Sequence, residues 1–127
     1  MKQIKTSEDA YQLIRPLLEG EEQENLIMLS LNSAGIVKNI DWLSFGSDTQ
    51  TVMSSKQIAR QAILNNAVGV ILSHNHPSGR TRPSFADDEN TKRVKEALEL
   101  VEIRLMDHLI IGDANNRFFS YSDNGKF

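Results

Sequence analysis

Hydrophobic side chains recur at helical spacing in three stretches of the chain. Over residues 6–19 the apolar positions follow the i, i+3, i+4, i+7, i+8 pattern of one buried helix face: Ala10, Leu13, Ile14, Leu17 and Leu18. Thr6 and Asp9 have the spacing of a capping box at the start of this helix. Ser54 or Ser55 can begin a second helix to about residue 65, and Ser84 a third to about residue 100. Their expected inward faces hold Ile58, Ala59, Ala62 and Ile63 in the second, and Val94, Ala97, Leu98 and Val101 in the third.

Apolar runs of strand length lie between these helices. Residues 26–31 and 36–45 flank the turn-forming Asn-Ser-Ala-Gly segment and predict a β-hairpin. Residues 67–72 form a continuous, largely β-branched run, which is typical of a strand buried on both faces. This run is followed by a loop over 73–79. Further strands are expected over 50–53, 104–111 and 117–121. The order of elements predicts an α/β domain with a mixed β-sheet flanked by helices.

Composition and charge narrow the class of protein. The 127 residues leave room for a single domain, residues 1–127, and the net charge of -3 has the wrong sign for a protein that binds mainly by neutralising phosphates. DNA association is therefore expected to be weak. The chain has no cysteine, so any metal must be held by histidines and carboxylates. It has neither an apolar leader nor a membrane-length run, and we expect a cytoplasmic protein without membrane contact.

A candidate metal site follows the predicted buried strand. If the extended conformation persists, His74 and His76 project from the same side and form a clamp. Asp87 follows after a loop restricted by proline and glycine. Three ligands of type His, His and Asp would leave one position of a tetrahedral Zn2+ open for water, as in catalytic zinc sites. A His-x-His pair also arises by chance, and Ser84 with Asp87 is a capping box in its own right; the cap and the metal site can coexist.

The remaining polar residues near these segments have simpler interpretations. His108 lies in a predicted strand at no motif-like spacing from the pair, and we expect a buried, hydrogen-bonded sheet histidine. Asp88 and Glu89 are expected to be solvated carboxylates of the first helical turn.

Three segments together resemble the JAB/MPN domain of the RadC family. They are Ser-His-Asn-His-Pro-Ser-Gly at 73–79, Pro-Ser-x2-Asp at 83–87 with Thr91, and Asp-His-Leu-Ile-Ile-Gly at 107–112. The His-x-His-Pro-x6-Ser-x2-Asp pattern is the signature of JAMM metallopeptidases, and the resemblance runs from about Ile4 to Tyr121. It implies the JAB/MPN fold, a curved mixed sheet with helices on both sides, related to cytidine deaminases. A zinc deaminase of that relation would need cysteine ligands, which this chain lacks.

The resemblance also implies roles for individual residues. His74, His76 and Asp87 would bind Zn2+, Glu24 would act as general acid and base, and Ser84 would donate a hydrogen bond to the oxyanion. Glu22 and Glu21 lie close enough in the sequence to be alternatives to Glu24. The implied activity is that of a zinc-dependent metallopeptidase or isopeptidase, which cleaves an amide bond in a peptide or protein substrate. No residue pattern indicates an oligomeric state.

Two departures from the family pattern bear on function. RadC proteins commonly carry a helix-hairpin-helix segment that could bind DNA, and we expect none in residues 1–127. Residues 54–57, Ser-Ser-Lys-Gln, stand where the family often shows His-Pro-Arg-Glu. The alternative function is therefore a non-catalytic or accessory module in DNA repair or partner binding, which retains the metal for stability.

Overall fold

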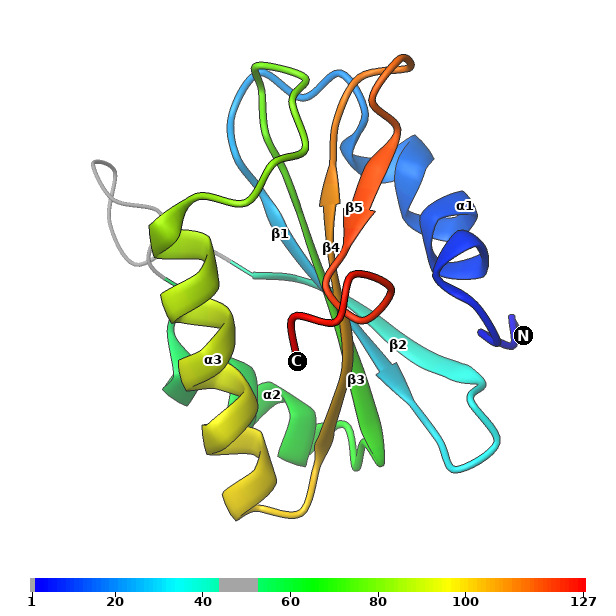
Figure 1. The fold of residues 1–127 in the computed structure, drawn as a ribbon. Coiled ribbons are helices and arrows are strands. Elements are labelled where there is room, and N and C mark those ends of the chain that lie inside the picture. Colours follow the sequence, from blue (N-terminus) through cyan, green and yellow to red (C-terminus); the bar gives the residue numbers. More distant parts are fainter. Residues whose placement is uncertain (1, 44–52) are drawn as a thin grey trace.

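The protein forms one five-stranded mixed sheet between helices, in a computed structural model that describes residues 2–43 and 53–127 (Figure 1). The helices are α1 (Ser7–Leu18), α2 (Ser55–Leu64) and α3 (Phe85–Leu100). The strands are β1 (Leu26–Leu31), β2 (Val37–Leu43), β3 (Gly69–Asn75), β4 (Arg104–Ile111) and β5 (Phe118–Ser120). The predicted α/β class with a mixed, helix-flanked sheet is confirmed, and it agrees with the JAB/MPN fold.

The strand order is β2-β1-β3-β4-β5, with β3 at the centre. Strand β1 runs antiparallel to both β2 and β3, so the predicted hairpin is confirmed. Strands β3 and β4 are parallel, and α3 forms the crossover between them. All seven residues of β3 are buried, as the continuous apolar run predicts. The carboxyl end of β3 therefore emerges from the middle of the sheet, beside the start of α3.

The helices cover opposite faces of the sheet (Figure 1). One apolar cluster joins α1 to its face of the sheet and includes Ala10, Tyr11, Ile14, Leu18, Ile27, Leu29, Ile71 and Leu109. The other joins α2 and α3 to the opposite face and includes Met28, Ile58, Ala62, Val70, Leu72, Val94 and Leu98. The capping box of Thr6 and Asp9 at the start of α1 is present as predicted. Burial of one stripe per helix accounts for the two layers around the sheet.

The structure corrects three local predictions. Strand β3 continues to Asn75 rather than ending before Ser73, because its pairing with β4 extends to the end of both strands. Ile63 and Val101 were expected to face inward but are 55% and 41% exposed. Ile63 lies in the last turn of α2, and Val101 caps α3 after its final turn. At these helix ends the apolar positions are no longer covered by the core.

Some predictions fall on residues outside the described part of the chain. They are the end of the second strand, at 44–45, and most of the short strand at 50–53. Within the described ranges, no helix combines the length and apolar character that a membrane span requires.

Candidate metal centre

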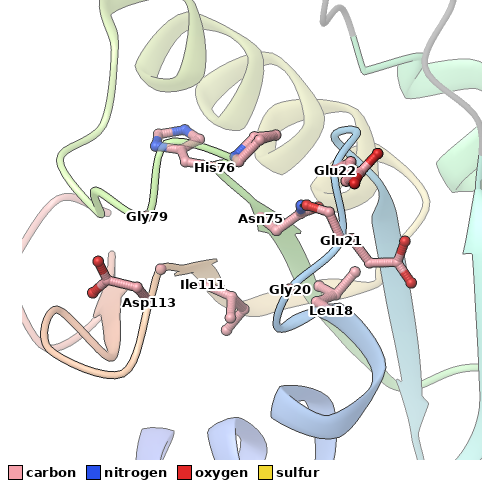
Figure 2. A pocket seen from close by; sticks show the side chains of 11 residues that line it. Leu18, Gly20, Glu21, Glu22, Asn75, His76, Gly79, Ile111 and Asp113 are labelled. Atoms are coloured by element: carbon pink, nitrogen blue, oxygen red, sulfur yellow. The ribbon is translucent and has the colours of Figure 1, made fainter.

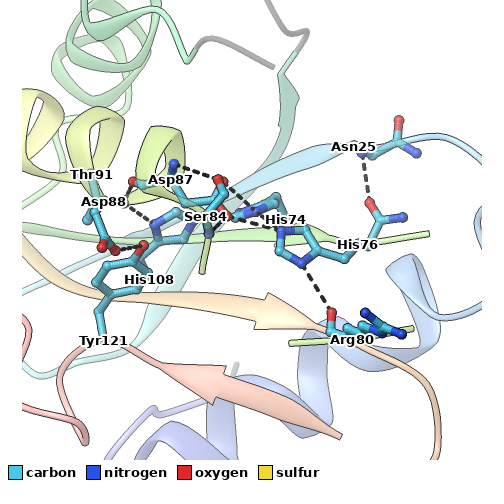
Figure 3. Close-up of polar contacts among 11 residues, drawn as sticks. Asn25, His74, His76, Arg80, Ser84, Asp87, Asp88, Thr91, His108 and Tyr121 are labelled. Atoms are coloured by element: carbon cyan, nitrogen blue, oxygen red, sulfur yellow. Dashed lines mark hydrogen bonds and ion pairs between the residues drawn. The ribbon is translucent and has the colours of Figure 1, made fainter. Parts of the chain in front are cut away.

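Two histidine rings project from the carboxyl end of β3 toward the start of α3 (Figure 3). Because β3 is extended through Asn75, His74 and His76 lie on the same side of the strand, as the clamp prediction requires. His74 is 2% exposed, and His76 is partly buried. Their Nε2 atoms are 3.1 Å apart. His76 Nδ1 lies 3.1 Å from the Arg80 carbonyl oxygen. Because a carbonyl can only accept, Nδ1 carries the hydrogen, and the Nε2 of a neutral His76 ring is then unprotonated.

Asp87 completes the group from the first turn of α3. Its Oδ1 lies 3.3 Å from His74 Nε2, and its Oδ2 lies 3.1 Å from His76 Nε2. The same carboxylate belongs to a capping box: Oδ2 accepts the Ser84 backbone N–H at 2.8 Å, while Ser84 Oγ accepts the Asp87 N–H at 3.0 Å. The capping box is therefore present, and its carboxylate is the one that lies beside both histidines. The cap fixes the carboxylate in the position from which it faces both histidines.

The electrostatics of the group favour an ionised carboxylate. Burial would raise the pKa of Asp87, but the interactions of its carboxylate with His74 and His76 outweigh burial and hold this pKa far below its usual range. The hydrogen bond to Asp87 raises the pKa of His76, against the effect of burial, and the negative charges of Asp87 and Glu24 add to the rise. The site thus already stabilises positive charge between these side chains.

The three side chains form a group that could hold a metal ion. His74, His76 and Asp87 each offer one ligand atom, and these atoms lie within 4.8 Å of one another. Ligands about 2.05 Å from a tetrahedral Zn2+ are spaced by about 3.3 Å. The two Nε2 atoms are 3.1 Å apart, and they approach different oxygens of Asp87: His74 lies 3.3 Å from Oδ1, and His76 lies 3.1 Å from Oδ2. Two imidazoles and one carboxylate are also a ligand set that zinc takes in catalytic centres, with a fourth position left for water.

Behind the clamp, a chain of buried hydrogen bonds links His74 to α3. His74 Nδ1 lies 2.7 Å from His108 Nε2, and His108 Nδ1 lies 2.6 Å from Thr91 Oγ. The Thr91 hydroxyl donates to the Asp87 backbone carbonyl at 2.7 Å. His108 is fully buried and stacks on the Tyr121 ring at 5.0 Å. Burial, together with the neighbouring histidines, holds the pKa of His108 well below its usual value. The predicted buried, hydrogen-bonded sheet histidine is confirmed, but its contact with the clamp was not foreseen.

Glu24 lies just before β1, across from the metal centre. Two residues further on, Leu26 pairs with His74, so the antiparallel register carries Glu24 toward His76. Its carboxylate contributes to the raised pKa of His76. Glu24 Oε2 is buried and has no hydrogen-bond partner among the described residues. By contrast, Glu21 and Glu22 are exposed.

Asn75 holds the segment that carries Glu24. Its side chain lies on the face of β3 opposite to the two histidines and is 3% exposed. Asn75 Oδ1 accepts the Asn25 backbone N–H at 2.7 Å, and Nδ2 donates to the Gln23 carbonyl at 3.0 Å. A longer contact of 3.4 Å reaches the Glu21 carbonyl. The end of β3 and the approach to β1 are therefore joined by side-chain bonds as well as by the sheet.

A cavity of about 190 Å³ opens beside His76 (Figure 2). It lies between the segment before β1, the loop after β3 and the turn after β4. Its lining includes Leu18, Glu21, Glu22, Asn75, His76, Pro77, Ile111 and Asp113. Of the three candidate metal ligands, His76 is the one that borders this cavity.

Comparison with known proteins places this site in a family. A RadC-like JAB domain matches residues 4–126. A UPF0758 protein of Coxiella burnetii (strain Dugway 5J108-111) is 37% identical over 123 residues, which are 97% of this chain and 54% of that protein. A UPF0758 protein of Porphyromonas gingivalis is 41% identical over 122 residues, 96% of this chain and 53% of that protein. The UPF0758 protein YfjY of Escherichia coli K12 is 40% identical over 108 residues, 85% of this chain and 66% of that protein. The chain spans about half the length of the first two.

Proposed function

The chain belongs to the RadC-like JAB-domain family, and from this membership and the geometry of the metal centre we propose that it is a zinc-dependent hydrolase of the JAMM type. Its reaction is the cleavage of an amide bond in a peptide or protein, as a metallopeptidase or isopeptidase. The observation that carries the proposal is the convergence of His74, His76 and Asp87 on one point, with the unpaired Glu24 carboxylate oxygen nearby.

The Zn2+ would be held by His74 Nε2, His76 Nε2 and one carboxylate oxygen of Asp87, and when bound it supplies a Lewis acid that makes water nucleophilic near pH 7. Glu24 accepts the proton of the attacking water and returns it to the leaving amine. A carboxylate oxygen with no other hydrogen-bond partner is free for this exchange.

In this proposal Ser84 stabilises the negative charge of the tetrahedral intermediate. Its Oγ accepts the Asp87 N–H, and this helix cap uses a lone pair of the hydroxyl rather than its hydrogen. The hydrogen is therefore available for donation to an oxyanion, and one hydroxyl can serve as both cap and donor. The exposure of Ser84 leaves it accessible to substrate.

The proposal is tested by Glu24→Gln, which keeps the size of the side chain but cannot accept a proton at neutral pH. Zinc content should stay at one equivalent per chain, while turnover of the best amide substrate from a peptide and isopeptide screen should fall by about 100-fold or more. Metal content is measured by elemental analysis. The double variant His74→Ala, His76→Ala should lose most of its zinc.

Glu21→Gln and Glu22→Gln are matched controls, since both glutamates are exposed and lie on the same segment. They should leave turnover close to that of the wild type. Wild-type turnover in Glu24→Gln would contradict the assignment of the base and direct attention to these two residues. A protein that binds zinc but cleaves no amide, with or without Glu24, would instead support the accessory module in DNA repair or partner binding.

A further inference from the structure

The buried hydrogen bonds behind His74 have directions that follow from the chemistry of their end group. A backbone carbonyl can only accept, so the hydrogen of the Thr91 hydroxyl is used at the Asp87 carbonyl, 2.7 Å away. Thr91 Oγ can then only accept from the ring nitrogen at 2.6 Å, which places a hydrogen on His108 Nδ1. As a neutral ring, His108 has an unprotonated Nε2.

The next link determines which nitrogen of His74 can bind a metal. His108 Nε2 accepts, so the contact of 2.7 Å requires the hydrogen of His74 to be on Nδ1. His74 Nε2 is then left with a free lone pair, and this is the atom that lies 3.1 Å from His76 Nε2 and 3.3 Å from Asp87 Oδ1. A metal-binding histidine is commonly fixed by the hydrogen bond that its other nitrogen donates.

We propose that His108 and Thr91 are positioning residues that set the tautomer and orientation of His74 and thereby raise the affinity of the site for Zn2+. The proposal rests on the metal centre of the proposed function, but not on catalysis. Neither residue touches the point where the three ligands converge. They act through His74, and their effect belongs to metal affinity rather than to the bond-breaking step.

The geometry also couples the two elements that supply the ligands. Thr91 lies one turn after Asp87 in α3 and bonds to the carbonyl of that ligand, while His108 bonds to the ligand from β3. His108 is held between these partners and stacks in parallel on Tyr121, with an interplanar angle of 7°. Because these contacts hold the His108 ring in one orientation, Nδ1 remains the donor to Thr91 and Nε2 remains the acceptor from His74.

The test is the tautomeric state of the imidazoles and the affinity for Zn2+ in matched variants. In 15N NMR of the zinc-loaded wild type, His74 and His108 should both carry their hydrogen on Nδ1. Thr91→Val removes the acceptor at almost constant size, so His108 can place its hydrogen on Nε2 and no longer accepts from His74. The affinity for Zn2+, measured by chelator competition, should then fall by about 10- to 100-fold.

Two further variants separate positioning from general destabilisation. Thr91→Ser retains the hydroxyl and should restore an affinity close to that of the wild type. Ser120→Ala removes another buried hydroxyl, which donates to Asp107 at 2.6 Å, and should lower thermal stability without a change in zinc affinity. The tautomer measurement on the wild type needs no substitution, so the test survives if Thr91→Val fails to fold.

The outcomes distinguish this proposal from the one on which it rests. A zinc-loaded wild type with the hydrogen of His108 on Nε2 would overturn the positioning role, as would a folded Thr91→Val protein of unchanged zinc affinity. Wild-type protein that takes up no zinc would overturn the metal centre itself and the positioning role with it.

Discussion

Replacement of Asn75 by alanine should separate the position of Glu24 from the binding of metal. Asn75 lies between the two clamp histidines in sequence but faces the other side of β3. Its amide binds the backbone of Asn25 and Gln23, on both sides of Glu24. Asn75→Ala removes these bonds and leaves the side chains of His74 and His76 in place.

The size of the effect can be worked from these contacts. Two short hydrogen bonds contribute about 1 kcal/mol each to the free energy of unfolding, and a partly buried N–H of Asn25 left without a partner costs about 1 kcal/mol more. The expected loss is about 2–3 kcal/mol, which corresponds to a fall in Tm of about 10 °C. A shift of about 1 Å in a reacting group can lower turnover by about 100-fold. Glu24 should therefore lose most of its contribution, while the zinc content remains at one equivalent.

The assay compares Asn75→Ala with Asn32→Ala. Asn32 Oδ1 also accepts two backbone N–H groups, from Ala34 at 2.9 Å and Ile36 at 3.0 Å, but in the turn between β1 and β2. Both variants should lose stability, and only Asn75→Ala should lose turnover below its melting temperature. If Asn75→Ala retains the turnover of Asn32→Ala, the hydrogen bonds of the Asn75 side chain do not position Glu24. If it loses zinc, the segment before β1 supports the ligands rather than Glu24.

Two other predictions concern the loop after β3 and the protonation of the site. In Gly112→Ala the added Cβ would lie 2.4 Å from the Gly79 carbonyl oxygen, so the β4–β5 turn must move away from the loop that carries His76. We expect the free energy of unfolding, measured by thermal unfolding, to fall by about 1–3 kcal/mol, and zinc binding to weaken. Because the folded pKa of His76 is raised, its interaction with Asp87 stabilises the metal-free protein fully below about pH 6.5, and this contribution is lost as pH rises through the raised pKa. Zinc replaces that proton, so calorimetry should show proton release that declines over the same pH range. Release independent of pH would refute this assignment.

Much of the fold could be predicted because its determinants are local. The capping boxes at Thr6 and Ser84 are pairs of residues three apart, and both are formed. The continuous apolar run of β3 indicated burial on both faces without any knowledge of its neighbours. The end of β3 was misplaced because Ser73, His74 and Asn75 are polar, and only pairing with the strands on either side keeps them extended.

The candidate site could likewise be predicted only where its determinants are local. The spacing of His74, His76 and Asp87 was enough to bring these residues together, since one strand and one helix start supply them. The contact of His108 with His74 spans 34 positions and depends on the parallel pairing of β3 with β4, which no local spacing encodes. The only sequence signal was that Thr91 and His108 lie within the segments that carry the family resemblance.

The sheet face that holds the metal centre combines two kinds of interior. Below His74, the face packs Leu72 and Val70 against apolar side chains of α2 and α3, whereas at the carboxyl end it buries imidazoles and a carboxylate. A buried polar cluster is tolerated only when its members have partners, and the chain from Asp87 through Thr91 and His108 to His74 supplies them.

Three buried side-chain oxygens among the described residues have no partner: Glu24 Oε2, Ser55 Oγ and Ser73 Oγ. A hydroxyl can rotate, and leaving it unpaired costs less than leaving a carboxylate oxygen unpaired. The unpaired oxygen of Glu24 lies beside the three candidate metal ligands, and in the proposed reaction it accepts the proton of the attacking water. The carboxylate oxygen that lacks a hydrogen-bond partner therefore belongs to the residue that the proposed reaction uses as its base.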